Sequence, residues 1–235
     1  MQIVRLKSQQ AITPYAPQWD APLAFIQWDQ PEKVDTIREF LLSKEEEILK
    51  LPFQGQGRTG LDDTAVTTRY GRYNVFDFAD ECPELNDMLD WVRESWAKFI
   101  TMDQTQAYNL RYTCWYNIIR KGQPIDNHRH CAGDGTYLSA NIHLDDYKDS
   151  GTIYEHMEMG MKLANVKGGL TFFPGYVEHR VPEYTGDDPR VSMAFDLYVY
   201  QPPWQGVQDH LKHNHFITPE EYANMYEKLN LTRTH

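Results

Sequence analysis

The sequence predicts a mainly β protein with flanking helices, arranged as a β-sandwich or barrel. Beyond about residue 108, short apolar or alternating segments are separated by Gly, Pro and Asp, a pattern typical of strands joined by turns. Before that point, two segments place their apolar residues at helical spacing. The chain has 235 residues, of which 41% are hydrophobic, so it can form one domain with a substantial core.

We expect one domain over residues 1–235, with helical and extended support in 1–107, a β core in 108–200 and a C-terminal helix in 201–235. In the support, residues 31–50 show helical spacing behind a proline suited to a first turn. Residues 83–100 carry a single apolar stripe. Residues 58–78 are rich in Thr, Tyr and Arg and are expected to be extended, either folding over the mouth of the barrel or forming an edge hairpin.

The expected strands of the core are five short segments, and a helix is expected after them. Thr218 is a suitable N-cap for that helix, with Pro219 at its first position and two glutamates in its first turn. The strand segments are NLRYTCWYNII, TYLSANIHL, GTIYEH, GGLTFFP and RVSMAFDLYVY.

Composition limits the partners and the compartment. The net charge is −11 and no basic run is present, so tight binding to nucleic acid is not expected. The first residues resemble neither a signal peptide nor a membrane span, and three cysteines suit a reducing compartment, so we expect a cytoplasmic protein that does not bind membranes. GQGRTG at 55–60 matches a dinucleotide-binding fingerprint in letters but lacks the strand before it and the helix after it. A homodimer is left open.

A histidine cluster, QPIDNHRHCAGD at 123–134, is the first candidate site. His128 and His130 are one residue apart, so on a strand they would share a face, and two imidazoles about 5–7 Å apart can chelate one ion. His179, which follows an apolar strand, is the natural third ligand. The alternative is that all three are ordinary loop or edge histidines without a metal.

A second candidate feature lies eleven positions after His179. Arg190 and Ser192 share one face of an expected strand with Ala194. A guanidinium beside a hydroxyl suits a small dicarboxylate, because arginine binds a carboxylate through two parallel hydrogen bonds. The alternative is a surface arginine at the start of a strand.

Taken in order, these motifs resemble the 2-oxoglutarate- and Fe(II)-dependent oxygenase superfamily, and the match runs from about Tyr108 to Tyr200. The resemblance implies a double-stranded β-helix, the jelly-roll or cupin-like fold. The motifs that carry it are Trp115-Tyr116-Asn117, Gly122 with His128 and His130, Leu138-Ser139-Ala140, Phe173-Pro174 with His179-Arg180-Val181-Pro182, and Arg190-Val191-Ser192.

The resemblance also implies an activity and its cofactors. His128, His130 and His179 would bind Fe(II), while Arg190 and Ser192 would bind the far carboxylate of 2-oxoglutarate. Asn117 would touch 2-oxoglutarate or a ligand, and the catalytic residues would be the three histidines with Arg190. The expected reaction is hydroxylation of a C–H bond in a small molecule, an amino acid or a peptide.

One departure from the superfamily affects the metal ligands. Most members have His-x-Asp where this chain has His128-Arg129-His130, and the spacing from Gly122 aligns His130 with the usual carboxylate. The ligands are therefore three histidines, or Asp134 or Asp126 supplies a carboxylate. A register that starts at His130 would give the His-x-Ala pattern of halogenases, but it breaks the glycine spacing.

Two other functions remain open at this point. One is a three-histidine metal dioxygenase that does not use 2-oxoglutarate and so does not need Arg190. The other is a catalytically silent jelly-roll binding module.

Overall fold

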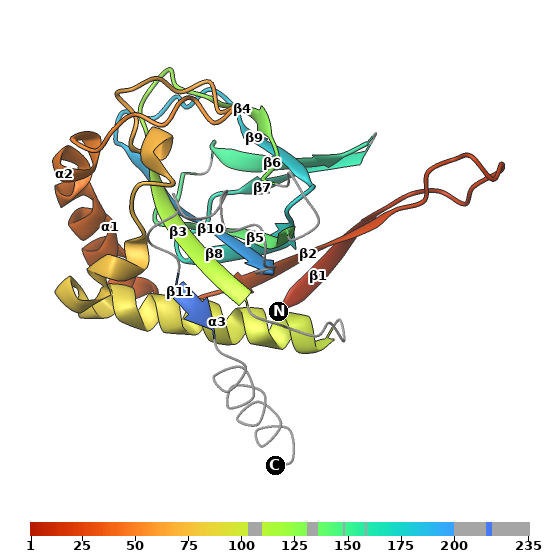
Figure 1. Ribbon diagram of the computed structural model, residues 1–235, viewed down its shortest axis with the longest axis horizontal. Coiled ribbons are helices and arrows are strands. Elements are labelled where there is room, and N and C mark those ends of the chain that lie inside the picture. The colour runs from red at the N-terminus through yellow and green to blue at the C-terminus, as the bar shows by residue number, and fades with distance from the viewer. Residues whose placement is uncertain (103–109, 131–135, 148, 158, 200–214, 218–235) are drawn as a thin grey trace, which may run out of the picture.

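Two antiparallel sheets face each other in the computed structural model, which describes residues 1–102, 110–130, 136–147, 149–157, 159–199 and 215–217 (Figure 1). The larger sheet has the strand order β1-β2-β8-β5-β10-β3-β11, and the smaller has the order β4-β9-β6-β7. This pair of sheets is the expected jelly roll, and the predicted fold class is confirmed.

Four of the five expected strand segments lie in the larger sheet, as its neighbouring strands β8, β5, β10 and β3. Its members are β1 (Gln2–Lys7), β2 (Asp20–Gln27), β3 (Leu110–Ile119), β5 (Thr136–His143), β8 (Gly169–Pro174), β10 (Arg190–Val199) and β11 (His215–Ile217). The smaller sheet contains β4 (Ile125–His128), β6 (Gly151–His156), β7 (Met159–Ala164) and β9 (Glu178–Val181).

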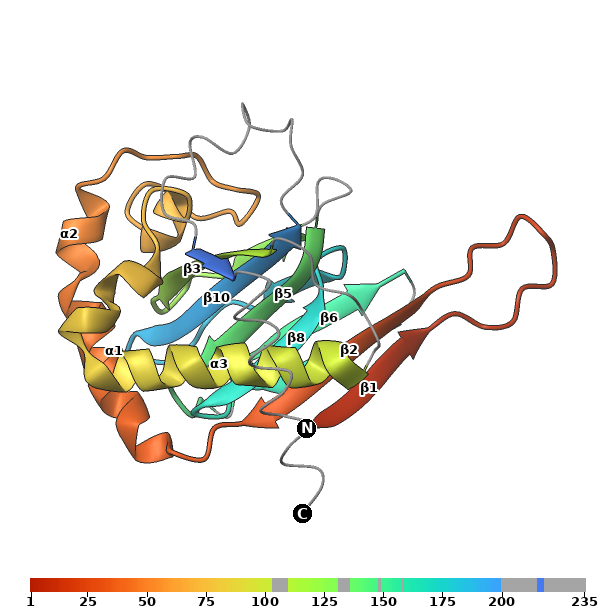
Figure 2. The same cartoon turned by 60° about the horizontal axis from the view of Figure 1, so that its bottom comes forward.

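The long helix α3 (Pro83–Met102) crosses the outer face of the larger sheet (Figure 2). It begins at a proline, whose missing N–H would be unpaired in a first turn anyway. Its apolar stripe is buried as the sequence predicted, with 3% exposure or less along Leu85, Met88, Leu89, Val92, Trp96 and Phe99. The helix therefore covers the face of the sheet that does not contact the smaller sheet.

The expected helix over residues 31–50 is divided. A 3-10 turn η1 (Pro31–Lys33) leads into α1 (Val34–Ser43), and α2 (Glu45–Leu49) follows. Between the two α-helices, the Lys44 N–H bonds to Leu41, which tightens the turn. The apolar positions Val34, Ile37, Leu41 and Ile48 are nevertheless buried.

The prediction that residues 58–78 are extended is wrong. They contain the 3-10 helix η2 (Val66–Arg69) and lead into η3 (Val75–Glu81). The β-branched and aromatic residues that suggested a strand are buried against β3 instead, with Val66 and Val75 both at 0% exposure. Tertiary packing overrides local strand propensity here.

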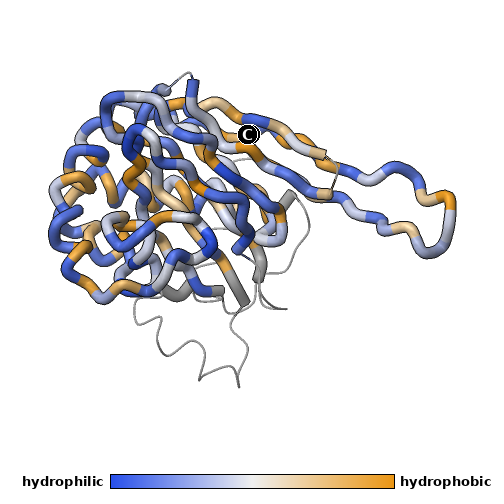
Figure 3. Tube along the Cα trace, turned by 90° about the horizontal axis from the view of Figure 1, so that it is seen from above, coloured by the Kyte–Doolittle hydropathy of each residue, from blue (hydrophilic) through white to orange (hydrophobic). Residues whose placement is uncertain are grey.

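The strands β1, β2, β7, β9 and β11 were not predicted. β1 and β2 form the hairpin at one edge of the larger sheet, and its connection projects from the rest of the chain with a hydrophobic tip (Figure 3). Ile12, which lies in this connection, is 98% exposed. Beyond residue 199, the structure describes only β11. The C-terminal helix expected in 201–235, with its N-cap Thr218, lies outside the described residues.

Two further sequence expectations concern cysteines and membranes. Cys82 and Cys114 are buried free thiols, while Cys131 lies outside the described residues. Among the described helices, none combines the length and apolar character that a membrane crossing requires.

Asn74 fastens the start of η3 to β3. Its fully buried amide accepts hydrogen bonds from the N–H groups of Phe76 and Cys114, both at 3.2 Å, and donates to the Tyr112 carbonyl, also at 3.2 Å. Asn74→Ala would leave the Cys114 N–H and the Tyr112 carbonyl without these partners, so we expect a loss of about 1–3 kcal/mol in the free energy of unfolding. Urea denaturation measures it. Exposed Asn86 is the matched control, and Asn86→Ala should change stability by less than about 0.5 kcal/mol.

Candidate functional site

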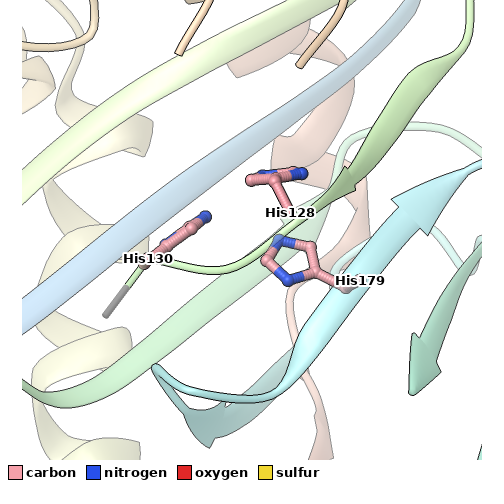
Figure 4. A group of neighbouring side chains, drawn as sticks. All are labelled: His128, His130 and His179. Carbon is pink, nitrogen blue, oxygen red and sulfur yellow. The ribbon is translucent and has the colours of Figure 1, made fainter. Parts of the chain in front are cut away.

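Three histidines meet between the two sheets. His128 is the last residue of β4 and is the antiparallel register partner of His179 on β9. His130 lies two residues beyond the end of β4, where its N–H bonds to the Gly175 carbonyl. The three side chains point toward one another (Figure 4). The sequence argument placed both His128 and His130 on a strand, and this holds for His128 alone.

The three rings are close enough to share one ion. Ring centroids are 4.3 Å apart for His128 and His179, 4.9 Å for His130 and His179, and 5.3 Å for His128 and His130. One ring nitrogen from each residue lies within 4.8 Å of the other two, so the group could hold a metal ion. Three imidazole ligands with open positions suit a transition metal.

Each of these rings has one nitrogen against an oxygen atom. Nδ1 of His128 lies 2.8 Å from the Asp126 carbonyl, and Nδ1 of His179 lies 3.3 Å from the Val177 carbonyl. Nδ1 of His130 lies 2.6 Å from Oδ1 of Asp196. Carbonyl oxygens and a carboxylate only accept, so each Nδ1 donates its proton and each Nε2 keeps a lone pair for a metal.

Electrostatics keeps two of the rings in the form that binds metal. Burial, together with the neighbouring His130, lowers the pKa of His128 to about 4. Burial also lowers the pKa of His179 well below its ordinary value, and the two other histidines add to that effect. Both imidazoles are therefore neutral at neutral pH, as a metal ligand must be.

A cavity opens beside the histidines, and both sheets contribute to its walls. Alternate residues of β10, namely Arg190, Ser192, Ala194 and Asp196, line one wall. The predicted common face of Arg190, Ser192 and Ala194 is therefore present. Other lining residues come from β3, β5 and β6, and from the segment before β3; they include Gln56, Thr67, Tyr70, Trp115, Asn117, Asn141, His143 and Thr152.

Arg190 is buried in that wall with only part of its hydrogen-bonding capacity used. It is 1% exposed, and its Nη2 donates to Nδ1 of His143 at 3.4 Å and to Oδ1 of Asn165 at 3.3 Å. Its Nε and Nη1 atoms have no partner among the described residues. No ion pair joins it to Asp187, Asp188, Asp196 or any other carboxylate in the described part of the chain. A buried guanidinium with two donor atoms left over could bind an anion.

Ser192 and Asn117 extend this polar wall. They are register partners on β10 and β3, and Nδ2 of Asn117 lies 3.4 Å from the Ser192 hydroxyl. The Thr67 hydroxyl in η2 donates to Oδ1 of Asn117 at 2.8 Å. The amide of Asn117 is thus held in place by protein groups, and its proposed contact with a ligand stays a prediction.

Asp126 and Asp134 were the two candidates for a carboxylate ligand, and of these only Asp126 lies in the described residues. The side chain of Asp126 is exposed, lies against Gly60 and is not in the histidine group, while Asp134 and the halogenase-like Ala132 lie outside the described residues. The carboxylate that reaches the centre belongs to Asp196, and it contacts His130 rather than the point where the rings converge. The period of β10 that identified Ala194 extends to Asp196 and would have found it.

Residues 58–78 contribute to the cavity, which decides between the two alternatives for this segment. Thr59, Thr67 and Tyr70 line it, as do Gln56 and Gly57 just before. Described residues in this region form turns and 3-10 helices and no edge hairpin. Tyr70 also lies against Trp115 of β3, with ring centroids 5.7 Å apart. The segment therefore forms part of the cavity wall.

Comparison with known proteins supports the fold. No protein-family model matches the chain, and no curated protein matches its sequence. A Pseudomonas putida prolyl-4-hydroxylase aligns with a TM-score of 0.51 and 13% identity over 76% of this chain and 93% of its own. A Trichoplax adhaerens prolyl hydroxylase, solved with a peptide fragment of hypoxia inducible factor, aligns with a TM-score of 0.53 and 13% identity over 75% and 83%.

A third solved structure is that of an enzyme described as a carbocyclase rather than a hydroxylase. The non-heme alpha ketoglutarate dependent carbocyclase SnoK from nogalamycin biosynthesis aligns with a TM-score of 0.51 and 15% identity over 83% of this chain and 92% of its own. At these identities the likeness establishes a shared fold. The chain has the jelly roll of the 2-oxoglutarate/Fe(II) oxygenases, as the sequence resemblance implied.

Proposed function

We propose that the chain is an Fe(II)- and 2-oxoglutarate-dependent oxygenase that hydroxylates a C–H bond of a small molecule, an amino acid or a peptide. The observation that carries the proposal is the pairing of three convergent histidines with a buried arginine on one cavity wall. Nε and Nη1 of Arg190 have no partner in the described part of the chain, so the guanidinium could bind an anion that enters this cavity. The fold shared with such oxygenases supports the same reading.

The residues present fit both cofactors. His128, His130 and His179 would hold the metal through Nε2, since each Nδ1 is already donating. Arg190 would bind the remote carboxylate of 2-oxoglutarate, with the Ser192 hydroxyl beside it. When bound, Fe(II) and 2-oxoglutarate supply the oxidation, in which oxygen is consumed, the oxo acid becomes succinate and CO2, and one oxygen atom enters the substrate.

The protein's own contribution is placement and exclusion of water. The rings of His130 and His179 are flanked by Trp115 and Phe173, which keep that side of the centre apolar. Gln56, Thr67 and Tyr70 form another part of the cavity wall, where they would face the substrate. Aromatic, amide and hydroxyl groups together suit an uncharged or weakly polar substrate group.

An anaerobic titration tests the proposal directly. The purified chain is mixed with Fe(II) and then with 2-oxoglutarate, and visible absorbance is followed for the weak charge-transfer band of the chelate. We expect a saturable band at one 2-oxoglutarate per chain, and succinate formation once oxygen is admitted. A chain that binds iron but develops no band would point to a three-histidine dioxygenase that does not use 2-oxoglutarate. A chain that binds neither would be a silent jelly-roll module.

A further inference from the structure

Asp196 is the carboxylate that contacts the group of three histidines. It lies on β10, six residues after Arg190, and its side chain lines the same cavity. Its Oδ1 atom accepts from Nδ1 of His130 at 2.6 Å and from the Ser139 hydroxyl at 2.7 Å. The side chains of His130 and Asp196 are 9% and 27% exposed, so this contact is largely shielded from water.

The three histidines differ in the acceptor that each ring meets. Nδ1 of His128 and of His179 face backbone carbonyls, which carry no net charge. Only His130, among the three, faces a carboxylate. A carboxylate on Nδ1 fixes the tautomer, orients the ring and makes Nε2 a stronger donor to a metal.

The histidine that faces a carboxylate is also the one that replaces a carboxylate ligand in the resembled motif. His130 stands where the resembled motif has a carboxylate ligand, so three neutral imidazoles leave the centre with one more positive charge. Asp196 brings one negative charge back, at the far nitrogen of the same residue. The charge is thus placed one imidazole ring away from the metal position.

We propose that Asp196 is a positioning residue that acts through His130, supplying to a three-histidine metal centre the negative charge that a direct carboxylate ligand would otherwise provide. The inference rests on the metal centre of the proposed function. It does not depend on 2-oxoglutarate or on the identity of the substrate. It therefore can be tested with a metal alone.

The test is the affinity of the full-length protein for Co(II), a spectroscopically visible stand-in for Fe(II), measured by titrating visible absorbance with a competing chelator. Asp196→Asn keeps the shape and an oxygen acceptor but removes the charge. We expect it to weaken Co(II) binding by about 10- to 100-fold, the usual effect of removing such a partner. Asp196→Ala removes the hydrogen bond as well and should weaken binding at least as much.

Two controls separate this effect from a general loss of charge or of packing. Ser139→Ala removes the other hydrogen bond to Oδ1 while leaving the carboxylate in place, and should change Co(II) affinity less than about 3-fold. Asp90→Asn removes one charge from an exposed position on α3 and should have no measurable effect. Thermal melting of the metal-free variants checks that the fold is kept.

The outcomes distinguish this inference from the proposed function. Wild-type protein that binds no Co(II), or a His179→Ala variant that binds it like wild type, would overturn the metal centre and this inference with it. If those two behave as expected but Asp196→Asn binds like wild type, only the role of the charge is overturned. Normal binding by Asp196→Asn with weak binding by Asp196→Ala would reduce Asp196 to a hydrogen-bonding partner, which also overturns the proposal.

Discussion

Replacing His179 by alanine is expected to abolish stoichiometric Fe(II) binding while leaving the fold intact. His179 is the central member of the group, 4.3 Å from the His128 ring and 4.9 Å from the His130 ring by centroids. Without it, two imidazoles remain, and they are the pair that lies farthest apart, at 5.3 Å. Two ligands cannot form the facial triad of protein ligands that holds Fe(II) and leaves its other coordination positions open.

The fold should survive because the His179 ring contributes little to it apart from packing. Among the described residues, the ring makes one hydrogen bond, the 3.3 Å contact with the Val177 carbonyl at the end of a tight turn. The lost ring leaves a cavity beside Phe173 and Tyr154, which we expect to cost about 1–3 kcal/mol of stability. Circular dichroism and thermal melting measure this loss.

Iron content per chain after anaerobic loading and desalting is the decisive measurement for this variant. His156→Ala is the matched control, because His156 lies on β6, contacts Trp19 and Tyr176, and is not in the histidine group. We expect one iron per chain for wild type and His156→Ala, and none for His179→Ala. Full iron occupancy in His179→Ala would remove this residue from the site.

The central strands and the histidine group were predictable from local pattern. The segments that became β3, β5, β8 and β10 are apolar runs bounded by turn residues, and their burial follows from composition alone. The pairing of His128 with His179 was suggested by spacing and is a register contact between β4 and β9. In each case a short stretch of sequence contained the signal.

Features that depend on distant contacts were missed. β2 contains Pro22 and is short of turn signals, and it becomes a strand because β1 and β8 pair with it on either side. Residues 66–69 form a 3-10 helix because buried side chains there pack on β3, against their strand propensity. Asp196 and His130 are 66 positions apart in the sequence. The alternation of β10 predicts which face Asp196 shares, but it does not predict the contact with His130.

The partners of Arg190 illustrate the same limit. An inward arginine followed from the period of its strand, but His143 on β5 and Asn165 beyond β7 could not be assigned to it from sequence. Because arginine only donates, Nδ1 of His143 must accept, which requires a neutral ring. Burial, with Arg190 beside it, lowers the pKa of His143 well below its ordinary value, consistent with that role. Both partners accept from Nη2, while Nε and Nη1 have no partner among the residues that the structure describes.

Arg190→Ala is therefore expected to weaken 2-oxoglutarate binding by roughly 30- to 1000-fold while iron binding survives. A bidentate guanidinium–carboxylate pair in a buried wall contributes on the order of 2–4 kcal/mol, and each 1.4 kcal/mol is about one decade in affinity. The three histidines make no hydrogen bond with Arg190, whose side chain bonds to His143 and Asn165 within the described part of the chain. Succinate formation against 2-oxoglutarate concentration, beside iron content, measures both effects.

Two further variants make the Arg190 result decisive. Arg190→Met fills most of the same volume without a charge, so it tests the carboxylate contact even if Arg190→Ala folds poorly. Arg120→Ala removes an exposed arginine at the end of β3 that pairs with Glu45, and it should leave 2-oxoglutarate binding unchanged. Because the Arg190→Met substitution also removes the two Nη2 hydrogen bonds to His143 and Asn165, thermal melting of the metal-free variant checks that the fold is kept. If Arg190→Met instead unfolds readily and binds 2-oxoglutarate like wild type, Arg190 is a structural residue and the oxygenase proposal loses its main support.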